Sequence, residues 1–247
     1  MIKAIAVDLD RTLLHTNKSL SAFTVSVLKR CQERGMKILL ATARPERTAK
    51  NYCDAIGFDA MVFSNGARVI CSDKVTEFGI PYESAESLLV ALSSNPDTKI
   101  TLETGDEAYS NKPIEDYYTV ITDDLPSVAK AEGTLKILAH IENEDVIRTA
   151  LPSDVYYTVS NGYLMQFMSK SATKWNGVKA MLDSVGCLPE ETAYFGDDHD
   201  DIEPIRKCGM GVAVSNAIDE VKAVADHIAE NNDADGVAEF IERNLLR

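Results

Sequence analysis

Two groups of acidic side chains follow short apolar runs of the sequence. Asp8 and Asp10 come just after Ala4–Val7, and Asp197 opens an acidic segment just after Ala193–Phe195. In an extended chain, residues two apart project to the same side, so Asp8 and Asp10 can face one point. Carboxylate oxygens suit Mg²⁺, and like charges gathered in one place need a cation. Each segment alone is equally well explained as a solvated acidic loop, but their convergence would predict a divalent metal site.

Three further polar side chains lie where an apolar run ends or a helical pattern begins. Thr42 and Asn65 each follow an apolar run, and Lys174 begins a stretch with helical periodicity. The Thr42 hydroxyl and the Lys174 ammonium could bind phosphate oxygens, Asn65 could add an amide donor, and Lys174 could offset the charge of Asp8. The alternatives stay open, because Thr42 could be a helix cap, Asn65 a turn residue and Lys174 a surface lysine.

The sequence around these residues predicts strands that alternate with helices. A helical pattern around Val27 can be capped by Ser19 or Ser21 and ended by Gly35, and a later one is ended by Gly186. This alternation predicts a doubly wound, Rossmann-like parallel α/β sheet, which gathers its functional residues at the carboxyl ends of its strands. The predicted strands are Ala4–Val7, Ile38–Ala41, Ala60–Phe63, Ala193–Phe195, Val212–Val214 and His227–Ala229.

The middle of the chain has a different pattern. Residues 81–169 contain several strand-like runs and only two clear helical stretches, which predicts an inserted α+β domain. Residues 1–80 and 170–247 would then form the core. Since both connections come near predicted site residues, the insertion is expected to act as a mobile lid. Its predicted strands are Ile100–Leu102, Leu135–Ile141, Tyr156–Val159 and Leu164–Met168.

Composition narrows the classes of partner. The chain has 39 acidic and 25 basic residues, a net charge of −14, which argues against nucleic acid and anionic membrane surfaces as partners. A phosphate site would therefore need local positive charge. The five cysteines form no C-x-x-C pair, and no apolar run approaches the length of a membrane span. A cytoplasmic protein with reduced cysteines is expected.

The order and spacing of these motifs resemble the haloacid dehalogenase superfamily. Within it, the chain is most similar to the Cof-like sugar-phosphatase branch, which carries a large type IIB α/β cap after the third strand. The resemblance covers nearly the whole chain. It is carried by Asp8–Leu13, Thr42–Arg44, Ser64–Ala67, Lys174 with Gly177, Gly196–Ile202, Gly211–Asn216 and Asp235–Ala238.

The resemblance implies a Mg²⁺-dependent phosphatase for a small phosphorylated metabolite, with sugar phosphates favoured. Asp8 would be the nucleophile that forms an aspartyl-phosphate, and Asp10 the general acid and base. The remaining roles implied are phosphate or substrate binding by Thr42, Asn65, Lys174 and Arg44, metal binding by Asp8, Asp10 and Asp197, and support from behind by Asp200 and Asp201.

Three positions depart from the family pattern. Arg11 and Ala43 replace frequent glycines, and Asp200 stands where asparagine is usual. Arg11 puts in doubt a left-handed backbone at that position, and Asp200 leaves the metal preference open.

Two other functions remain open. One is a phosphomutase or phosphotransferase of the same superfamily, and the other is a non-catalytic, receiver-like phospho-acceptor module, which also gathers carboxylates at strand ends. Lys174 and the large insertion favour an enzyme.

Overall fold

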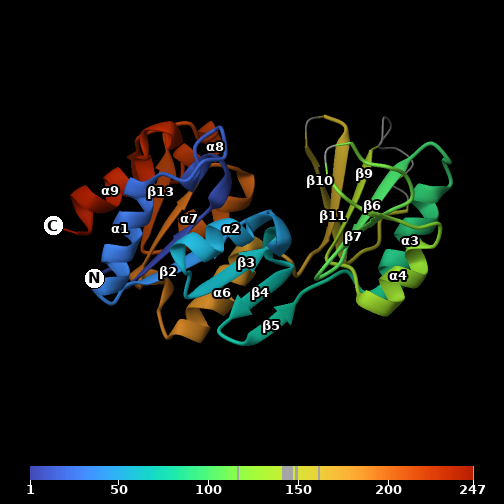
Figure 1. Cartoon of the computed structure of the whole chain (residues 1–247), viewed down its shortest axis with the longest axis horizontal. Helices are drawn as coiled ribbons and strands as arrows, with labels where there is room; N and C mark the ends of the chain where they lie inside the picture. The colour runs from blue at the N-terminus through green and yellow to red at the C-terminus, as the bar shows by residue number, and fades with distance from the viewer. Residues whose placement is uncertain (116, 141–146, 148–149, 161, 247) are drawn as a thin grey trace. The chain divides into compact units, whose positions relative to one another are not determined.

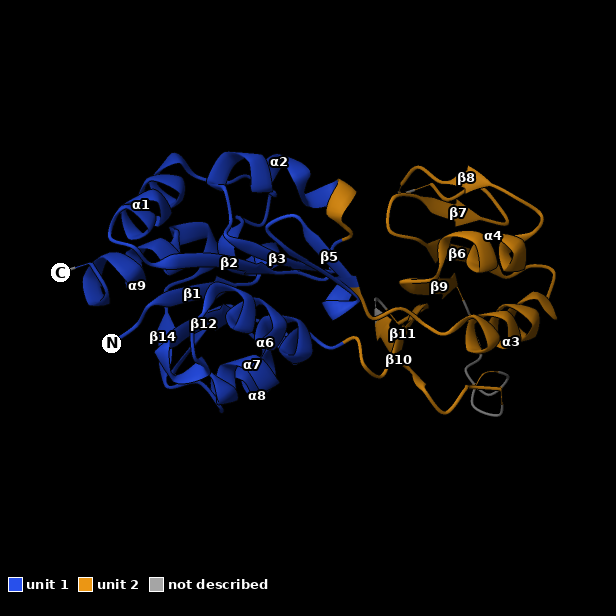
Figure 2. Ribbon diagram, turned by 90° about the horizontal axis from the view of Figure 1, so that it is seen from below, with its two compact units in different colours: residues 1–44, 48–76, 173–247 blue, residues 45–47, 77–172 orange. Residues whose placement is uncertain are grey.

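The computed structural model describes residues 1–115, 117–140, 147, 150–160 and 162–246 (Figure 1). The chain divides into two compact units, which Figure 2 shows in different colours. The first consists of Met1–Arg44, Thr48–Thr76 and Thr173–Arg247, and the second of Pro45–Arg47 and Glu77–Ala172. Each unit is built around its own sheet.

The described residues of the first unit form an eight-stranded sheet in the order β14-β13-β12-β1-β2-β3-β4-β5. Neighbouring strands from β14 to β3 run parallel, and β4 is antiparallel to β3. All six predicted core strands are present in this sheet. Its strands are β1 (Ala4–Val7), β2 (Lys37–Ala41), β3 (Ala60–Phe63), β4 (Arg68–Cys71), β5 (Lys74–Glu77), β12 (Thr192–Gly196), β13 (Met210–Val214) and β14 (His227–Ala229).

Helices cover both faces of this sheet, which explains why its central strands are apolar throughout. Every residue of β1 is buried. Figure 2 shows α1 and α2 on one face and α6 and α7 on the other. The predicted doubly wound α/β core is therefore confirmed. The helices are α1 (Ala22–Glu33), α2 (Glu46–Ile56), α6 (Lys174–Val185), α7 (Ile202–Lys207), α8 (Asp219–Lys222) and α9 (Gly236–Asn244).

Local signals set the ends of the two predicted helices. Of the two candidate caps for α1, Ser21 is the one used, because its hydroxyl accepts a hydrogen bond from the Thr24 N–H (2.9 Å). The helix α6 begins after Thr173, whose hydroxyl accepts from the Asn176 N–H (3.1 Å), and ends at Gly186 with a left-handed φ of 70°. Lys174 is thus the first residue of α6.

The hairpin of β4 and β5 was not predicted. The residues of β5 are mostly exposed and include no apolar run, so they lack the signal that identified the other strands. Pairing with β4 at the edge of the sheet decides their conformation.

The second unit contains a mixed sheet of six described strands in the order β10-β11-β9-β6-β7-β8. Helices α3 (Tyr82–Ser93) and α4 (Leu125–Glu132) lie side by side against one face (Figure 1), which confirms the predicted α+β insertion. The short strands β7 and β8 were not predicted, and Ile141, placed in a predicted strand, lies outside the described residues. The strands are β6 (Lys99–Glu103), β7 (Ala108–Ser110), β8 (Val120–Ile121), β9 (Lys136–His140), β10 (Val155–Ser160) and β11 (Leu164–Ser169).

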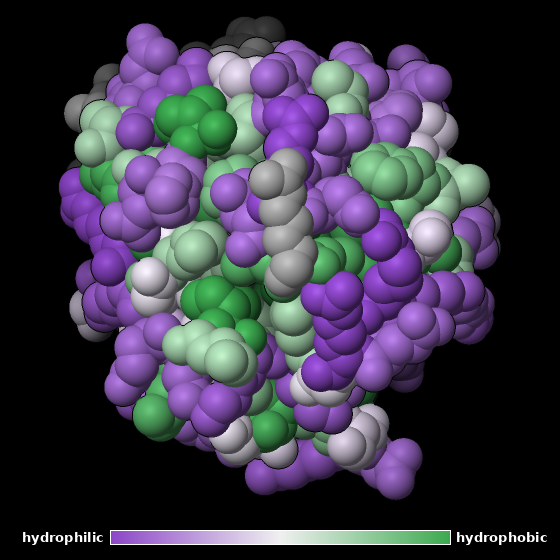
Figure 3. Space-filling view, turned by 90° about the vertical axis from the view of Figure 1, so that its left-hand side faces the viewer, coloured by the Kyte–Doolittle hydropathy of each residue, from purple (hydrophilic) through white to green (hydrophobic). Residues whose placement is uncertain are grey.

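Among the described residues, no helix is both long and apolar enough to cross a bilayer. Figure 3 faces the end of the first unit where the chain termini lie, and it shows hydrophobic residues in several patches among hydrophilic ones.

Candidate active site

A cluster of three buried carboxylates lies at the carboxyl ends of two adjacent strands. Asp8 follows β1, Asp197 follows β12, and Asp201 lies one turn further along. One carboxylate oxygen from each residue lies within 4.8 Å of the others. The three residues are only 5%, 4% and 0% exposed. The two acidic segments singled out in the sequence therefore do converge, and neither is a solvated loop at these positions.

Lys174 is the buried cation of this cluster. Its Nζ donates to Oδ1 of Asp8 (2.7 Å) and to Oδ1 of Asp201 (2.7 Å). Burial by itself lowers the pKa of Lys174, but the neighbouring carboxylates of Asp201 and Asp8 raise it overall. Lys174 is thus charged and offsets the charge of Asp8, and the alternative of a surface lysine is wrong.

Asp201 accepts four hydrogen bonds from the protein itself. Lys174 and the Tyr194 hydroxyl donate to Oδ1 (both 2.7 Å), and the N–H groups of Asp197 and Asp198 donate to Oδ2 (3.0 and 3.1 Å). Because both oxygens already have partners, this carboxylate positions Lys174 and the loop that carries Asp197. That arrangement supports the prediction of a residue acting from behind the site.

The electrostatics of the cluster favour a bound cation. Burial raises the pKa of Asp8 well above its usual value, although Lys174 counteracts part of this effect. Burial and the nearby Asp201 raise the pKa of Asp197 to about 6, against a hydrogen bond from the Thr12 hydroxyl (3.0 Å). One lysine cannot balance three buried carboxylates. Their hard oxygen atoms fit a divalent metal ion, which would remove this repulsion.

Asp10 belongs to a separate ion-pair network. Arg44 donates from Nε to Oδ2 (2.6 Å) and from Nη2 to Oδ1 (2.7 Å), and Lys18 Nζ donates to Oδ1 (2.7 Å). Burial acts to raise the pKa of Asp10, but the hydrogen bonds from Arg44 and Lys18 lower it overall. The Asp10 carboxylate lies outside the carboxylate cluster described above.

The chain stays extended at both aspartates and turns only after them. The ψ angles of Asp8 and Asp10 are 157° and 131°, and the left-handed turn comes at Arg11, whose φ is 58°. The expectation that the two side chains face one point therefore stays a prediction. The role of Asp10 as a metal ligand stays a prediction.

Arg11 occupies the left-handed region that a glycine would occupy. Its φ is 58° and ψ 6°, so the doubt raised by an arginine at this position is removed. Its carbonyl accepts from Asn216 Nδ2 (2.7 Å), its guanidinium donates to the Asn216 carbonyl (3.3 Å), and Nε lies 3.7 Å from Asp197 Oδ2. Left-handed backbone costs an L-residue roughly 1–2 kcal/mol, and such strain is typical of functional sites.

Thr42 and Asn65 occupy adjacent loops at the same edge of the sheet. The Thr42 side chain is buried and accepts from the Arg44 N–H (3.2 Å), which also supports its alternative role as a local cap. The Thr42 carbonyl accepts from the Asn65 N–H (3.2 Å), and the Asn65 amide donates to Asp200 Oδ2. Asp200, predicted to act behind the site, is thereby tied to a predicted phosphate-binding residue.

Close packing holds the Asn65 loop against the start of α6. Gly66 has a φ of 106°, and a Cβ there would lie 2.2 Å from the Thr173 carbonyl oxygen. Only glycine fits at that distance. Lys174 follows Thr173 directly, so this contact fixes the residue that pairs with Asp8.

Three side chains at the site had no predicted role. Thr12 donates to Asp197, Tyr194 donates to Asp201, and Lys18 pairs with Asp10. A tyrosine inside a buried strand is a signal that could have been used, because its hydroxyl needs a partner. Lys18 lies in a polar loop and gives no such signal.

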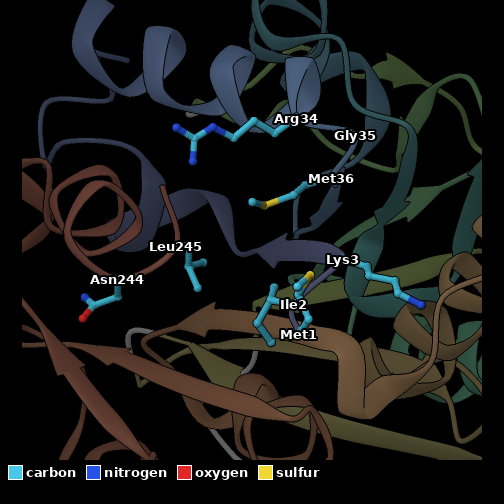
Figure 4. Close-up of a pocket in the computed structure, with 8 residues that line it drawn as sticks. All are labelled: Met1, Ile2, Lys3, Arg34, Gly35, Met36, Asn244 and Leu245. Carbon is cyan, nitrogen blue, oxygen red and sulfur yellow. The ribbon is translucent and has the colours of Figure 1, made fainter. Parts of the chain in front are cut away.

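A cavity of ≈ 370 Å³ lies elsewhere in the first unit (Figure 4). It is lined by residues 1–3 and 34–36 with Asn244 and Leu245. Residues 1–3 precede β1 and residues 34–36 precede β2, so the cavity lies at the amino ends of these strands. The carboxylate cluster follows the carboxyl ends, and the cavity is therefore not part of the candidate active site.

Comparison with known protein families identifies the family of this chain. Residues 5–241 match the model for haloacid dehalogenase-like hydrolases. The chain belongs to this family. Within this family the chain falls in the predicted Cof-like, type IIB branch. The prediction of an enzyme is also confirmed, because the chain is a phosphatase of the haloacid dehalogenase family.

Relatives of known sequence match along nearly their full length. The chain is 26% identical to the 5-amino-6-(5-phospho-D-ribitylamino)uracil phosphatase YitU of Bacillus subtilis, with 96% of each protein covered. It is also 26% identical to phosphoglycolate phosphatase 1 of Saccharolobus solfataricus, with 99% of this chain and 96% of that protein covered.

Solved structures agree in fold. A haloacid dehalogenase-like hydrolase from Bacteroides thetaiotaomicron superposes with a TM-score of 0.87 at 26% identity, covering 98% of this chain and 99% of that one. The subclass IIB sugar phosphatase BT4131 superposes with a TM-score of 0.81 at 23% identity, covering 98% of each chain.

Proposed function

We propose that this haloacid dehalogenase-type phosphatase hydrolyses small phosphate monoesters with Mg²⁺ and forms a covalent phosphate on Asp8. The observation that carries the proposal is the position of Asp8. It is buried at the end of β1, paired with Lys174 at 2.7 Å, and clustered with Asp197 and Asp201. Relatives named for their substrates act on small phosphorylated metabolites.

In the first step, a carboxylate oxygen of Asp8 attacks phosphorus, and the bond from phosphorus to the leaving oxygen breaks. Oδ1 of Asp8 is fixed by Lys174, which leaves the second oxygen to react. The ammonium of Lys174 and the hydroxyl of Thr42 are proposed to bind the phosphate oxygens. Water then attacks the phosphorus of the aspartyl-phosphate, the bond from phosphorus to the Asp8 oxygen breaks, and inorganic phosphate leaves the regenerated Asp8 carboxylate.

Asp10 is proposed to give a proton to the leaving oxygen and then to take one from the attacking water. Arg44 and Lys18 lower the pKa of Asp10, so they favour its carboxylate form, which acts as the base. Arg44 is also a proposed phosphate contact. An Arg44 that moves to the phosphate would leave the Asp10 carboxyl with one cation fewer and better suited to hold the proton it donates.

Asp8, Asp10 and Asp197 are proposed to hold Mg²⁺, and the ion would neutralise the charge gathered between them and the phosphate. These residues fit Mg²⁺ because they offer hard oxygen donors and because the cluster has an excess of buried negative charge. Asp201 is a less suitable ligand because both its oxygens already accept hydrogen bonds.

We propose further that residues 81–169 form a cap that sets substrate specificity, with sugar phosphates as favoured substrates. The named relatives include one that acts on a phosphorylated ribityl compound and one that acts on phosphoglycolate. Both substrates are small monoesters, and they differ in whether the leaving group carries hydroxyls or a carboxylate.

The test is release of inorganic phosphate from a panel of esters in Mg²⁺, with wild type, Asp8→Asn and the exposed control Asp219→Asn. The expected result is multiple turnover by wild type and Asp219→Asn and none by Asp8→Asn. Turnover that requires a second phosphate acceptor would indicate a phosphotransferase or phosphomutase. Phosphorylation of Asp8 without turnover would indicate a phospho-acceptor module, and substantial hydrolysis by Asp8→Asn would sink the assignment of the nucleophile.

A further inference from the structure

Tyr194 is a fully buried tyrosine in β12, an interior strand of the first unit's sheet. In the register of the parallel strands it lies between Ala6 of β1 and Gly211 of β13. Both neighbouring strands are apolar. A phenylalanine would fill the same space without bringing a polar group into the core. The hydroxyl of Tyr194 therefore needs its own explanation.

The Tyr194 hydroxyl donates to Oδ1 of Asp201 (2.7 Å). Burial and the charges of Asp201 and Asp8 raise the pKa of Tyr194 well above its usual value, so the hydroxyl keeps its proton. The ordinary explanation of this bond is that a buried hydroxyl must find an acceptor. The acceptor here, however, is one of the three carboxylates that together could hold a metal ion.

Asp201 lies close enough to the other two carboxylates to serve as a metal ligand. One of its oxygens is within 4.8 Å of oxygens from Asp8 and Asp197. A carboxylate has about four lone-pair sites, two on each oxygen. Two backbone N–H groups donate to Oδ2, and Lys174 and Tyr194 donate to Oδ1. With Tyr194 in place, no site on this carboxylate is left for a cation.

Packing keeps the Asp201 side chain in this position. A Cβ at Gly196 would lie 2.4 Å from Cβ and 2.5 Å from Cγ of Asp201, so the side chain rests against the backbone of Gly196. Asp201 is also 0% exposed. If the Tyr194 hydroxyl were removed, the carboxylate could not turn to water, and a buried acceptor would lose its partner.

We propose that the Tyr194 hydroxyl keeps Asp201 from binding the metal ion and thereby makes the site selective for Mg²⁺ over Ca²⁺. Ca²⁺ takes roughly six to eight oxygen ligands in flexible geometry, whereas the smaller Mg²⁺ needs an octahedral shell and keeps several waters. One more carboxylate therefore favours Ca²⁺. Tyr194 is a positioning residue, because it acts only through Asp201. The inference rests on the proposed function, which supplies a metal ion at Asp8, Asp10 and Asp197.

The experiment measures the dissociation constants of Mg²⁺ and of Ca²⁺ by isothermal titration calorimetry, on the full chain freed of metal with EDTA, at pH 7. Tyr194→Phe removes only the hydroxyl. Tyr109→Phe is the matched control, because the Tyr109 hydroxyl also donates to a carboxylate, that of Glu132, at 2.7 Å in the second unit. Asp201→Asn, alone and together with Tyr194→Phe, completes a double-mutant cycle. Circular dichroism checks the folding of each variant, and hydrolysis of p-nitrophenyl phosphate in Mg²⁺ is measured on the same samples.

Wild type and Tyr109→Phe should bind Mg²⁺ more tightly than Ca²⁺. Tyr194→Phe should bind Ca²⁺ about tenfold more tightly than wild type does, which corresponds to the strength of one hydrogen bond to a charged group, and its affinity for Mg²⁺ should change by less than about twofold. In the Asp201→Asn background the same substitution should change the affinity for Ca²⁺ by about twofold or less, because the charge through which it acts is absent.

An unchanged ratio of the two constants in Tyr194→Phe, or an equal change with and without the Asp201 carboxylate, would overturn the inference, since the hydroxyl would then only satisfy the core. If Tyr194→Phe does not fold, wild type and Asp201→Asn decide. Asp201→Asn should keep the wild-type ratio within about twofold, because Asp201 is not a ligand there. A larger change in that ratio, or a wild type that prefers Ca²⁺, overturns the inference. Wild type that binds neither ion and hydrolyses no ester refutes the proposed function itself.

Discussion

Replacing Asp197 by asparagine should stabilise the metal-free protein at neutral pH. Burial and the neighbouring Asp201 raise the pKa of Asp197 from 3.8 to about 6 in the folded state. The folded protein therefore binds this proton more tightly than the unfolded chain does. Ionising Asp197 at pH 7 consequently costs folding free energy, and the nearly isosteric amide avoids that cost.

The size of the effect follows from the pKa difference. At 1.36 kcal/mol per pKa unit, this shift lowers the free energy of unfolding by ~3 kcal/mol at pH 7. At pH 5 the loss is about half of that, because the folded protein already holds the proton. Thr12, which donates to Asp197, can still donate to the amide oxygen. Because burying the amide carries its own cost, we expect a gain of ~1–3 kcal/mol at pH 7.

The assay is urea unfolding in EDTA at pH 7 and pH 5, with Asp219→Asn as a control at a fully exposed aspartate. In excess Mg²⁺ the order should reverse, because ligand binding stabilises only the protein that retains the site. If Asp197→Asn is less stable than wild type in EDTA at pH 7, the burial cost assigned to Asp197 does not exist. A difference that stays constant between pH 7 and pH 5 would equally refute the linkage to its titration.

Three further outcomes are expected. Chelation by EDTA should abolish hydrolysis and Mg²⁺ should restore it, and full activity in EDTA would exclude the proposed cofactor. Asp10→Asn should reduce kcat by about 100-fold or more, since an amide neither donates nor takes the proton; near wild-type kcat would require another acid. Gly66→Ala should lower the free energy of unfolding by more than Gly35→Ala does, as measured in urea. Both glycines have positive φ, but only at Gly66 would the new Cβ meet a backbone oxygen, that of Thr173, at 2.2 Å; equal losses would show that this contact relaxes.

The strands that carry the site could be predicted because they are buried on both faces. A short apolar run such as Ala4–Val7 is needed wherever helices cover a sheet on both sides, and this requirement is local in sequence. The same is true of the ends of α6, set by Thr173 and Gly186. Strands with little burial, such as β5, carried no comparable signal.

The sequence predicted which residues belong to the candidate site better than it predicted how they are arranged. The carboxyl ends of neighbouring parallel strands must meet, so Asp8 and Asp197 were expected to converge. The common direction of the Asp8 and Asp10 side chains stays a prediction, but the two carboxylates have different partners, Lys174 for Asp8 and Arg44 for Asp10. No rule of spacing places Asp10 against Arg44 and Lys18.

The sequence by itself determined the fold class, the family and the strand ends at which the acidic residues lie, since each depends on local patterns of burial and motif order. Tertiary structure alone decided the partners of those residues. Lys174 meets Asp8 across 166 positions, and Asp201 gathers donors from α6, β12 and its own loop. Such contacts arise from how helices and strands pack, and packing distances between distant segments are not encoded in any single stretch of sequence.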